Sequence, residues 1–259
     1  SSDGTKIAYL GDQGTYSGGQ STSTTTTMTI TSDYQNRITN TYNGGEWGTV
    51  TFYSGYSSYI RLTSGGGNNN GIWLPVTFGA EWSVSFEWYL STANGADDMR
   101  FVFYAPNQPT SYAGSQHGGY NVFHEFYSGD EHTIRDPTDA PLSTVSTTYQ
   151  SSSWRLVSIS YNNGVLTTSV DGASGSSRTY TFTGSHLSAQ QALWGTNSYI
   201  AITGRTGGAS ASQYIQNINV SWVSTTQISP TVTPNRSEAS TRDWQNSAWV
   251  NPAYASDEV

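Results

Sequence analysis

Acidic residues gather in two short stretches of the sequence, each beside glycines. Asp97 and Asp98 lie in the run GADDMRFVFYAP, and four more carboxylates follow in the run GGYNVFHEFYSGDEHTIRDP: Glu125, Asp130, Glu131 and Asp136. Carboxylate oxygens accept hydrogen bonds from sugar hydroxyls, and they are also the ligands that calcium prefers. Glycine lets the backbone approach a ligand closely. The two stretches therefore predict a site for a sugar, a hard cation or both.

The elements that must position these carboxylates have the pattern of β-strands. Phe101–Tyr104 and Tyr120–Phe126 are predicted strands beside the acidic stretches. In Trp82–Tyr89, apolar residues alternate with polar ones, which predicts a half-buried antiparallel strand. The apolar face holds Trp82, Val84, Phe86 and Trp88, and the other face holds Ser83, Ser85, Glu87 and Tyr89.

The clearest local prediction is a β-hairpin. Trp154–Tyr161 and Val165–Val170 flank Asn162-Asn163-Gly164, and Asn-Gly is the strongest short-range signal for a hairpin turn. A short helical turn is expected near Ser188–Leu193. Further strands are expected at Ile7–Leu10, Thr25–Ile30, Thr49–Tyr53, Tyr59–Thr63, Tyr180–Thr183, Tyr199–Thr203 and Tyr214–Trp222. Many short strands without βαβ alternation predict an all-β antiparallel sandwich or jelly roll.

The chain changes character after its last predicted strand. That strand, Tyr214–Trp222, is expected to place Tyr214, Gln216, Ile218, Val220 and Trp222 on one face. Residues 223–259 then contain three prolines and few periodic apolar positions. We therefore expect a sandwich domain over residues 1–222 and an extended arm or linker over residues 223–259, ordered only where it packs on this domain or on a neighbour.

Composition excludes several classes of function. The chain of 259 residues has no cysteine, which excludes disulfides, thiol catalysis and thiolate metal sites. A net charge of −8 with 10 Lys and Arg residues argues against nucleic-acid binding. No apolar run approaches the ~20 residues that span a bilayer, so we expect no membrane insertion. The low charge and the Ser/Thr/Asn/Tyr-rich surface favour an extracellular or particle-surface location, and nothing in the sequence indicates an organic cofactor.

Four stretches, in this order, resemble the L-type lectins, the legume-lectin-like branch of the concanavalin A-like lectin/glucanase superfamily. GADDMRFVFYAP is similar to the strand that begins with the family's sugar-binding Asp, which falls on Asp98. VFHEFY resembles the metal-binding strand, with Glu125 at the family's Glu, and Asp136-Pro137 matches the Asp-Pro that follows. WRLVSISYNNGVLTTSVDG resembles the rear hairpin, and TGRTGGASASQYIQNINVSW resembles the closing segment, whose Thr-Gly loop lies beside the sugar.

The resemblance implies a concanavalin A-like sandwich that binds glycans without catalysis, with calcium as a candidate ion. The implied sugar-binding residues are Asp98, Gly119, Thr206, Gly207 and Gly208, and the metal candidates are Glu125, Asp130, Glu131 and Asp136. The sequence departs from the family pattern at Tyr127, Glu131 and Pro141, where the family has a metal-bridging Asp, a sugar- and calcium-binding Asn and a metal-binding His. A remodelled, single-metal or metal-free lectin follows from these departures.

Each motif also has a purely structural interpretation. The two aspartates could cap a turn, the acidic loop could be solvated, and the glycines could serve turn geometry. His124 and His132 could bind a metal, although a lone histidine is more often a surface or hydrogen-bonded residue. Aromatic residues at loops and strand ends are candidates for stacking on sugar rings: Tyr112, Tyr120, Tyr127 and Trp194.

Two other classes of function stay open. A glycoside hydrolase or lyase needs two carboxylates at a fixed separation, and Glu87 and Glu125 could face one sheet surface. The related glucanases carry Glu-x-Asp-x-x-Glu, whereas the run from Glu125 to Asp130 lacks the central Asp and the final Glu, which argues against an enzyme. The third class is a structural subunit of a fibre or virion, in which residues 223–259 would hold a copy of the chain or a neighbouring subunit.

Overall fold

The computed structural model describes residues 14–17, 20–31, 41–43, 51–53, 59–92, 97–107, 118–127, 129–149, 151–173, 177–228 and 231–234. The chain divides into two compact units: Ser23–Thr225, and a smaller unit made of Ser1–Thr22 and Thr226–Val259. The boundary expected at residue 222 stays a prediction. Within the described part of the chain, none of the helical segments has the length and apolar character that a bilayer crossing requires.

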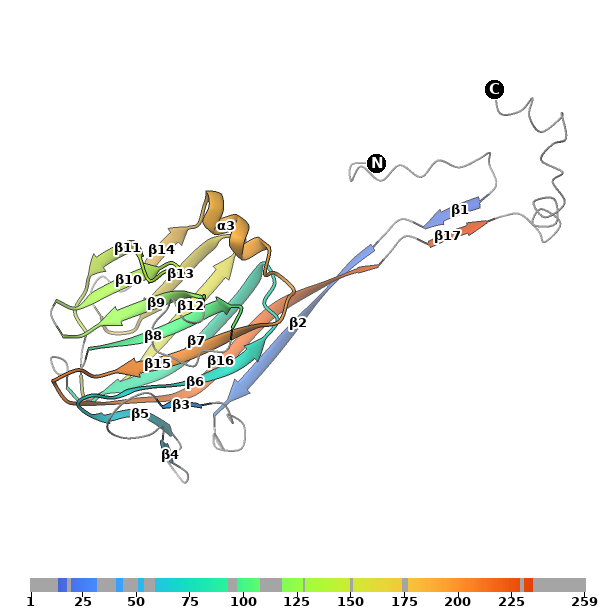
Figure 1. Cartoon of the computed structure of the whole chain (residues 1–259). Helices are drawn as coiled ribbons and strands as arrows, with labels where there is room; N and C mark the ends of the chain where they lie inside the picture. Colours follow the sequence, from blue (N-terminus) through green and yellow to red (C-terminus); the bar gives the residue numbers. More distant parts are fainter. Residues whose placement is uncertain are drawn as a thin grey trace, which may run out of the picture. The chain divides into compact units, whose positions relative to one another are not determined.

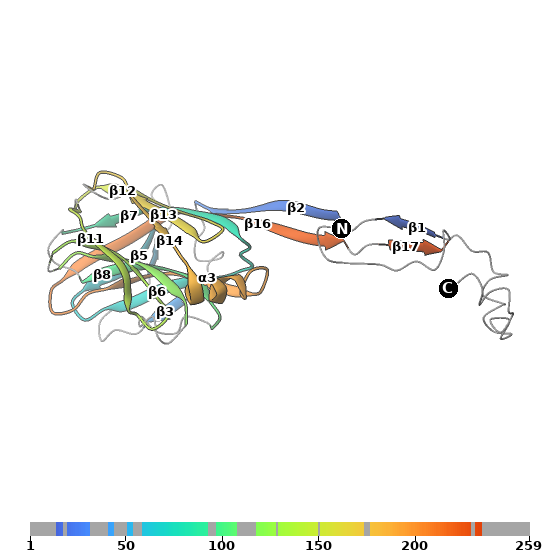
Figure 2. The same cartoon turned by 90° about the horizontal axis from the view of Figure 1, so that it is seen from above.

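The larger unit is a sandwich of two antiparallel sheets (Figures 1 and 2). The front sheet has the order β11 (Pro141–Ser146), β10 (Glu131–Arg135), β9 (Tyr120–Glu125), β8 (Asp98–Ala105), β15 (Ser198–Arg205), β6 (Asn69–Val76) and β3 (Thr41–Asn43). The back sheet has the order β14 (Arg178–Thr181), β13 (Val165–Val170), β12 (Trp154–Asn162), β7 (Glu81–Leu90), β16 (Ala211–Ile228), β5 (Tyr59–Gly65) and β4 (Thr51–Tyr53), and β2 (Gln20–Ile30) pairs with β16. The predicted all-β antiparallel sandwich is confirmed.

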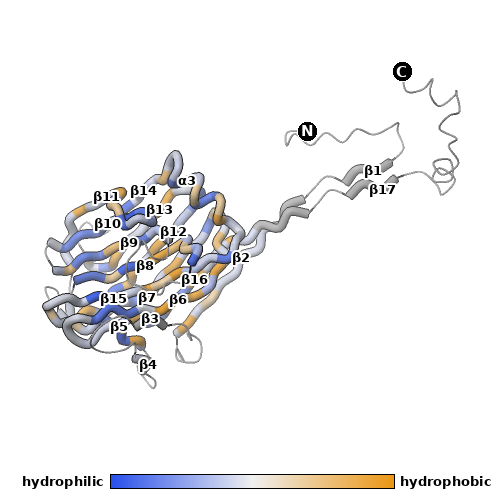
Figure 3. The backbone as a smooth tube through the Cα atoms, viewed as in Figure 1, coloured by the Kyte–Doolittle hydropathy of each residue, from blue (hydrophilic) through white to orange (hydrophobic). Residues whose placement is uncertain are grey.

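The core lies between the two sheets and is rich in aromatic rings. Hydrophobic and hydrophilic residues alternate along the strands (Figure 3), and in β7 the predicted inward residues are all buried. Trp82 stacks on Phe78 and on Tyr161, with ring centroids 4.6 and 5.4 Å apart, and its Nε1 atom donates to the Tyr104 hydroxyl. Each fully buried side chain such as Phe86 contributes about 1.5–3 kcal/mol to folding.

The predicted hairpin is present at β12 and β13. These strands pair from Val157 opposite Val170 to Asn162 opposite Val165. The two turn residues, Asn163 and Gly164, both have positive φ, at 49° and 92°. Asn and Gly adopt this conformation at the lowest cost, which explains why this sequence closes a two-residue turn.

The alternation predicted for Tyr214–Trp222 is wrong in its first half. Ile215 is buried, whereas Tyr214 lies on the outer face; Ile218 and Val220 are buried as expected. The pairing of β16 with β7 shifts register between Gln216 and Asn219, and Asn217 there has a φ of 53°. This β-bulge inserts one residue, so the inward positions change parity at the bulge.

A short helix covers one end of the core. α3 (Gly184–Gln191) includes part of the helical turn predicted near Ser188–Leu193. The Tyr161 hydroxyl of the back sheet donates to Gln190 Oε1 at 2.6 Å, and the Tyr120 hydroxyl of the front sheet donates to the His186 carbonyl at 3.1 Å. Because each sheet bonds to it, α3 ties the two layers together.

Residues from both ends of the chain form a separate two-stranded sheet. β1 (Gly14–Ser17) pairs antiparallel with β17 (Thr231–Pro234). In the larger unit, side-chain hydrogen bonds join Thr27 to Ser221 and Thr29 to Asn219. In every one of these pairs the two residue numbers add up to 248. The N-terminal segment therefore faces the C-terminal segment with the same residue offset in β1 and β17 as at Thr27 and Thr29. The predicted strand Ile7–Leu10 and residues 235–259 lie outside the described residues.

Candidate functional site

Several of the predicted site residues meet at one end of the front sheet. The strand registers place Arg205 opposite Asp98, Asp98 opposite Glu125, and Glu125 opposite Glu131. Opposed residues of neighbouring strands project from the same face of a sheet. The next residue of β8, Met99, belongs to the core, so this row lies on the outer face of the front sheet.

Asp98 lies at the centre of an ion-pair network. Its carboxylate lies 3.5 Å from Arg100 Nε and 4.0 Å from Arg205 Nη1, and the residue is only 2% exposed. Arg205 Nε also lies 3.2 Å from Asp97 Oδ2. A buried carboxylate requires such partners because removing it from water is costly. Asp98 thus lies between two guanidinium groups that each have a closer carboxylate: Asp139 Oδ1 lies 2.8 Å from Arg100 Nη1, and Asp97 lies closer to Arg205.

The loop after β15 packs directly against Asp97. The Thr206 amide donates to the Asn68 carbonyl at 2.9 Å, and the Asn68 amide donates to Thr206 Oγ1 at 3.0 Å, which fixes the loop. A Cβ atom on Gly207 would lie 2.7 Å from Asp97 Oδ2, whereas one on Gly208 would meet no atom within 4 Å. The absence of a side chain at Gly207 thus permits this contact, and Gly208 borders open space.

Gly119 does not join this group. Tyr120 pairs with Phe103, so Gly119 lies at the opposite end of β8 from Asp98, roughly 17–20 Å away along the strand. A Cβ atom on Gly119 would lie 2.8 Å from Val102 Cγ1 and 2.9 Å from Ala105 Cβ. This glycine allows close packing on β8.

Asp136 is also separated from the other three metal candidates. Glu125, Asp130 and Glu131 surround the turn between β9 and β10, whereas Asp136 follows the far end of β10, roughly 17 Å from Glu131 along the strand. Asp136 Oδ1 accepts hydrogen bonds from the Thr138 amide and hydroxyl and from the Ala140 amide. Although partial burial opposes it, these hydrogen bonds hold the pKa of Asp136 below its ordinary value.

Asp130 serves its own turn as well. Its φ is 34°, and its Oδ2 atom accepts a hydrogen bond from the Tyr149 amide at 3.0 Å. Partial burial raises the pKa of Asp130, and the hydrogen bond from Tyr149 only partly offsets this effect. Across the described residues, no group of three or more His, Asp or Glu side chains is arranged to hold a metal ion. The four predicted carboxylates thus do not fit as one calcium site.

The two histidines lie in the core beside the acidic turn. His124 and His132 are buried with ring centroids 4.5 Å apart, and His124 Nδ1 lies 2.7 Å from the Tyr149 hydroxyl. Burial, with a further contribution from His132, holds the pKa of His124 well below its ordinary value. The structure therefore gives these residues a packing role at the end of the sandwich.

The structure separates the two carboxylates that a hydrolase would need. Glu87 lies in the back sheet, where its Oε2 atom accepts hydrogen bonds from Gln216 and Asn217, and Glu125 lies in the front sheet. The expectation that they face one surface is wrong, because the strands belong to different layers. Of the aromatic candidates, Tyr120 is buried, Trp194 packs on the core and Tyr127 is 59% exposed; Tyr112 lies outside the described residues.

Neither Arg100 nor Arg205 was singled out from the sequence. Arg100 stands two residues after Asp98, and this spacing places both on one face of a strand. That signal was available. The approach of Arg205 depends on the pairing of β15 with β8, which joins residues more than a hundred positions apart.

Among the comparisons with known proteins, only those with solved structures give matches. No protein-family model and no curated protein matches the sequence. Solved lectin structures do match. The winged bean acidic lectin complexed with methyl-α-D-galactose has a TM-score of 0.60 at 10% identity, over 78% of this chain and 100% of that chain. The VIP36 exoplasmic/lumenal domain, in a form bound to Ca²⁺ and Man3GlcNAc, has a TM-score of 0.56 at 15% identity, over 74% and 86%.

Lectin II from Ulex europaeus gives a similar result, with a TM-score of 0.57 at 13% identity over 77% of this chain and 98% of that chain. At 10–15% identity, the similarity to these lectins shows the fold alone. The chain has the legume-lectin-like fold of the L-type lectins, as the sequence resemblance implied.

Proposed function

We propose that this chain is a non-catalytic carbohydrate-binding protein whose sugar site lies around Asp97, Arg205 and the loop at Gly207 and Gly208. The convergence of the acidic pair with this loop carries the proposal. The Asp97 carboxylate accepts hydrogen bonds from sugar hydroxyls, Arg205 donates them, and the open backbone at Gly208 borders the ligand. Asp98 was expected to be the main acceptor; in this proposal it acts through Arg100 and Arg205.

The lectin fold supports this function. The winged bean and VIP36 structures are complexes with sugars, and the matches cover 100% of the first chain and 86% of the second. A location at a cell or particle surface accords with the low content of charged residues and with the exoplasmic/lumenal description of the VIP36 domain. The VIP36 structure contains Ca²⁺, which motivates calcium assistance as a separate part of the proposal, and chelation tests that part.

A glycan array tests the proposal. The full chain is applied with Ca²⁺ and again with EDTA, beside the variants Asp97→Asn and, as a matched control, Asp171→Asn in the turn after β13. Binding that Asp97→Asn loses and Asp171→Asn keeps would support the site. Loss on chelation would support calcium assistance, and retention would discard it. No binding by the wild type in either buffer would overturn the function.

A structural subunit is the second candidate. One observation favours it: β1 and β17 form a two-stranded antiparallel sheet, and such a sheet has two edges whose backbone groups can pair with another chain. Residues 223–259 would then contact a copy or a neighbouring subunit. Sedimentation velocity of the full chain and of a chain ending at Thr225 tests this candidate. A structural subunit that assembles through residues 223–259 should lose its oligomeric state on truncation, whereas a full chain that is already a monomer would count against it.

A further inference from the structure

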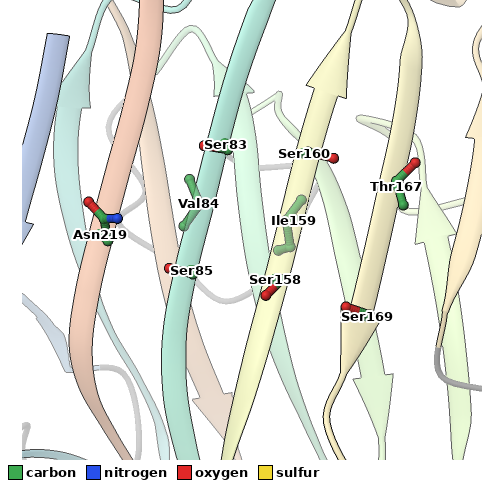
Figure 4. A pocket seen from close by; sticks show the side chains of 9 residues that line it. All are labelled: Ser83, Val84, Ser85, Ser158, Ile159, Ser160, Thr167, Ser169 and Asn219. Atoms are coloured by element: carbon green, nitrogen blue, oxygen red, sulfur yellow. The ribbon is translucent and has the colours of Figure 1, made fainter.

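The outer face of the back sheet carries a groove lined by hydroxyl groups (Figure 4). Its volume is about 230 Å³, and its polar lining comes from neighbouring strands: Ser83 and Ser85 of β7, Ser158 and Ser160 of β12, Thr167 and Ser169 of β13, and Asn219 of β16. The registers align Asn219, Ser85, Ser158 and Ser169 in one row across four strands. Because neighbouring strands lie about 4.8 Å apart, this row spans roughly 14 Å.

The groove offers hydrogen-bonding groups and no charge. Its lining contains no Asp, Glu, Lys or Arg. None of its five serine hydroxyls is hydrogen-bonded to another described residue, so each keeps its donor and its acceptor sites for solvent or a ligand. Val84 and Ile159 point to the core on the other side, which fixes the backbone beneath the serines. The groove is therefore a rigid, neutral surface that can match a ligand rich in hydroxyl groups.

Aromatic rings lie on the same face, further along the strands. Tyr89 of β7 and Trp154 of β12 have ring centroids 5.6 Å apart, and Tyr214 of β16 lies 5.7 Å from Tyr89. Tyr59 completes this cluster at 5.3 Å from Tyr214. Trp154 is 36% exposed. Ser85 and Tyr89 are four residues apart on the outward side of β7, so the groove and the cluster are separated by roughly 14 Å.

We propose that this face binds an uncharged, extended polysaccharide. Such a chain has apolar ring faces and a rim of hydroxyl groups. Along one strand direction the back sheet presents a cluster of mutually tilted aromatic rings and the hydroxyl groove, with Glu87 between them on the same side of β7. In this proposal a sugar ring stacks on Trp154, the exposed ring of the cluster, and sugar hydroxyls bond to the serines. The site is distinct from the one around Asp97, which lies on the outer face of the other sheet, and it stands independently of the proposed function.

The test uses the full chain and soluble β-glucan, xylan and dextran as probes in affinity gel electrophoresis. The double variant Ser85→Gln/Ser158→Gln fills the groove, and Trp154→Ala removes the exposed ring. Val165→Gln is the control, because Val165 is exposed on the same hairpin but does not line the groove. We expect one of these polysaccharides to retard the wild type, and both test variants to bind it about tenfold more weakly or worse, with the control unchanged. Circular dichroism and Tm show that each variant is folded.

Three results would overturn the proposal. The first is that none of the three polysaccharides retards the wild type. The second is that the groove and ring variants bind as the wild type does. The third is that sedimentation velocity finds a wild-type dimer that the double variant converts to monomer, which would make this face a self-association surface. Gly207→Ala separates this site from the front-sheet site, because it should leave polysaccharide retardation unchanged even if it abolishes binding on the glycan array.

Discussion

The Nε atom of Arg205 lies 3.2 Å from Asp97 Oδ2, and the same carboxylate oxygen would lie 2.7 Å from a Cβ atom on Gly207. The ion pair and the glycine loop thus fix Asp97 from two sides. Arg205 reaches Asp98 as well, at 4.0 Å, so one half-exposed guanidinium group joins both neighbouring carboxylates. This arrangement makes the proposed sugar site sensitive to changes too small to disturb the fold.

The two glycines of the loop should respond differently to the same substitution. Gly207→Ala places a methyl group against the Asp97 carboxylate and should weaken glycan binding about tenfold by displacing it. Gly208→Ala meets no atom within 4 Å and should leave affinity unchanged. Isothermal titration with the strongest array glycan measures both. Equal glycan affinities for the two variants would show that the Asp97 carboxylate is not part of the sugar site.

The two arginines that flank Asp98 should differ in their effect on stability. Arg100 is buried, so Arg100→Met leaves the buried carboxylate poorly paired and should cost about 3 kcal/mol or more of unfolding free energy. Arg205 is 47% exposed, so Arg205→Met should cost less than about 1 kcal/mol. Urea unfolding of both variants gives the comparison. A larger loss for Arg205→Met would contradict the burial argument.

Acid should destabilise the sandwich through His124. Its pKa is lowered in the folded state, so the unfolded state binds the proton more readily, and stability is lost as pH falls below the ordinary value of 6.5 towards the folded pKa. The slope for this one group is at most about 1.4 kcal/mol per pH unit. The ionisable groups packed around it are His132 and Tyr149, beside the ring of Trp88.

Urea unfolding between pH 7.5 and 5 measures this effect. The variant His124→Phe should flatten the dependence of the unfolding free energy on pH. The assignment to His124 would fail if the wild type and His124→Phe lost stability in parallel over this range.

Much of the fold could be predicted because its signals are local. Alternation in Trp82–Tyr89 and the Asn163-Gly164 turn depend on residues close in sequence, and both match the structure. The bulge at Asn217 was missed, because strict alternation was assumed along the whole of β16. The inserted residue exchanges the inward-facing and outward-facing positions on one side of the bulge.

The candidate site was predicted only in part, because its assembly depends on long-range pairing. Asp98, Glu125, Glu131 and the loop at Gly207 meet through the registers of β8, β9, β10 and β15. The same registers carry Gly119 and Asp136 to the opposite end of the sheet. Spacing along the sequence could not show which residues lie at the same end of the sheet. That depends on the direction and register of each strand, which are set by pairing with strands distant in sequence.

Calorimetric titration of Asp97→Asn beside Asp171→Asn shows whether the sugar site lies at Asp97. Both variants remove one carboxylate charge, but only Asp97 contacts Arg205 and borders Gly207. With the strongest glycan from the array, we expect saturable binding by the wild type and by Asp171→Asn, and an affinity at least about tenfold weaker for Asp97→Asn. Unchanged affinity in Asp97→Asn, with the protein folded, would contradict the proposed sugar site.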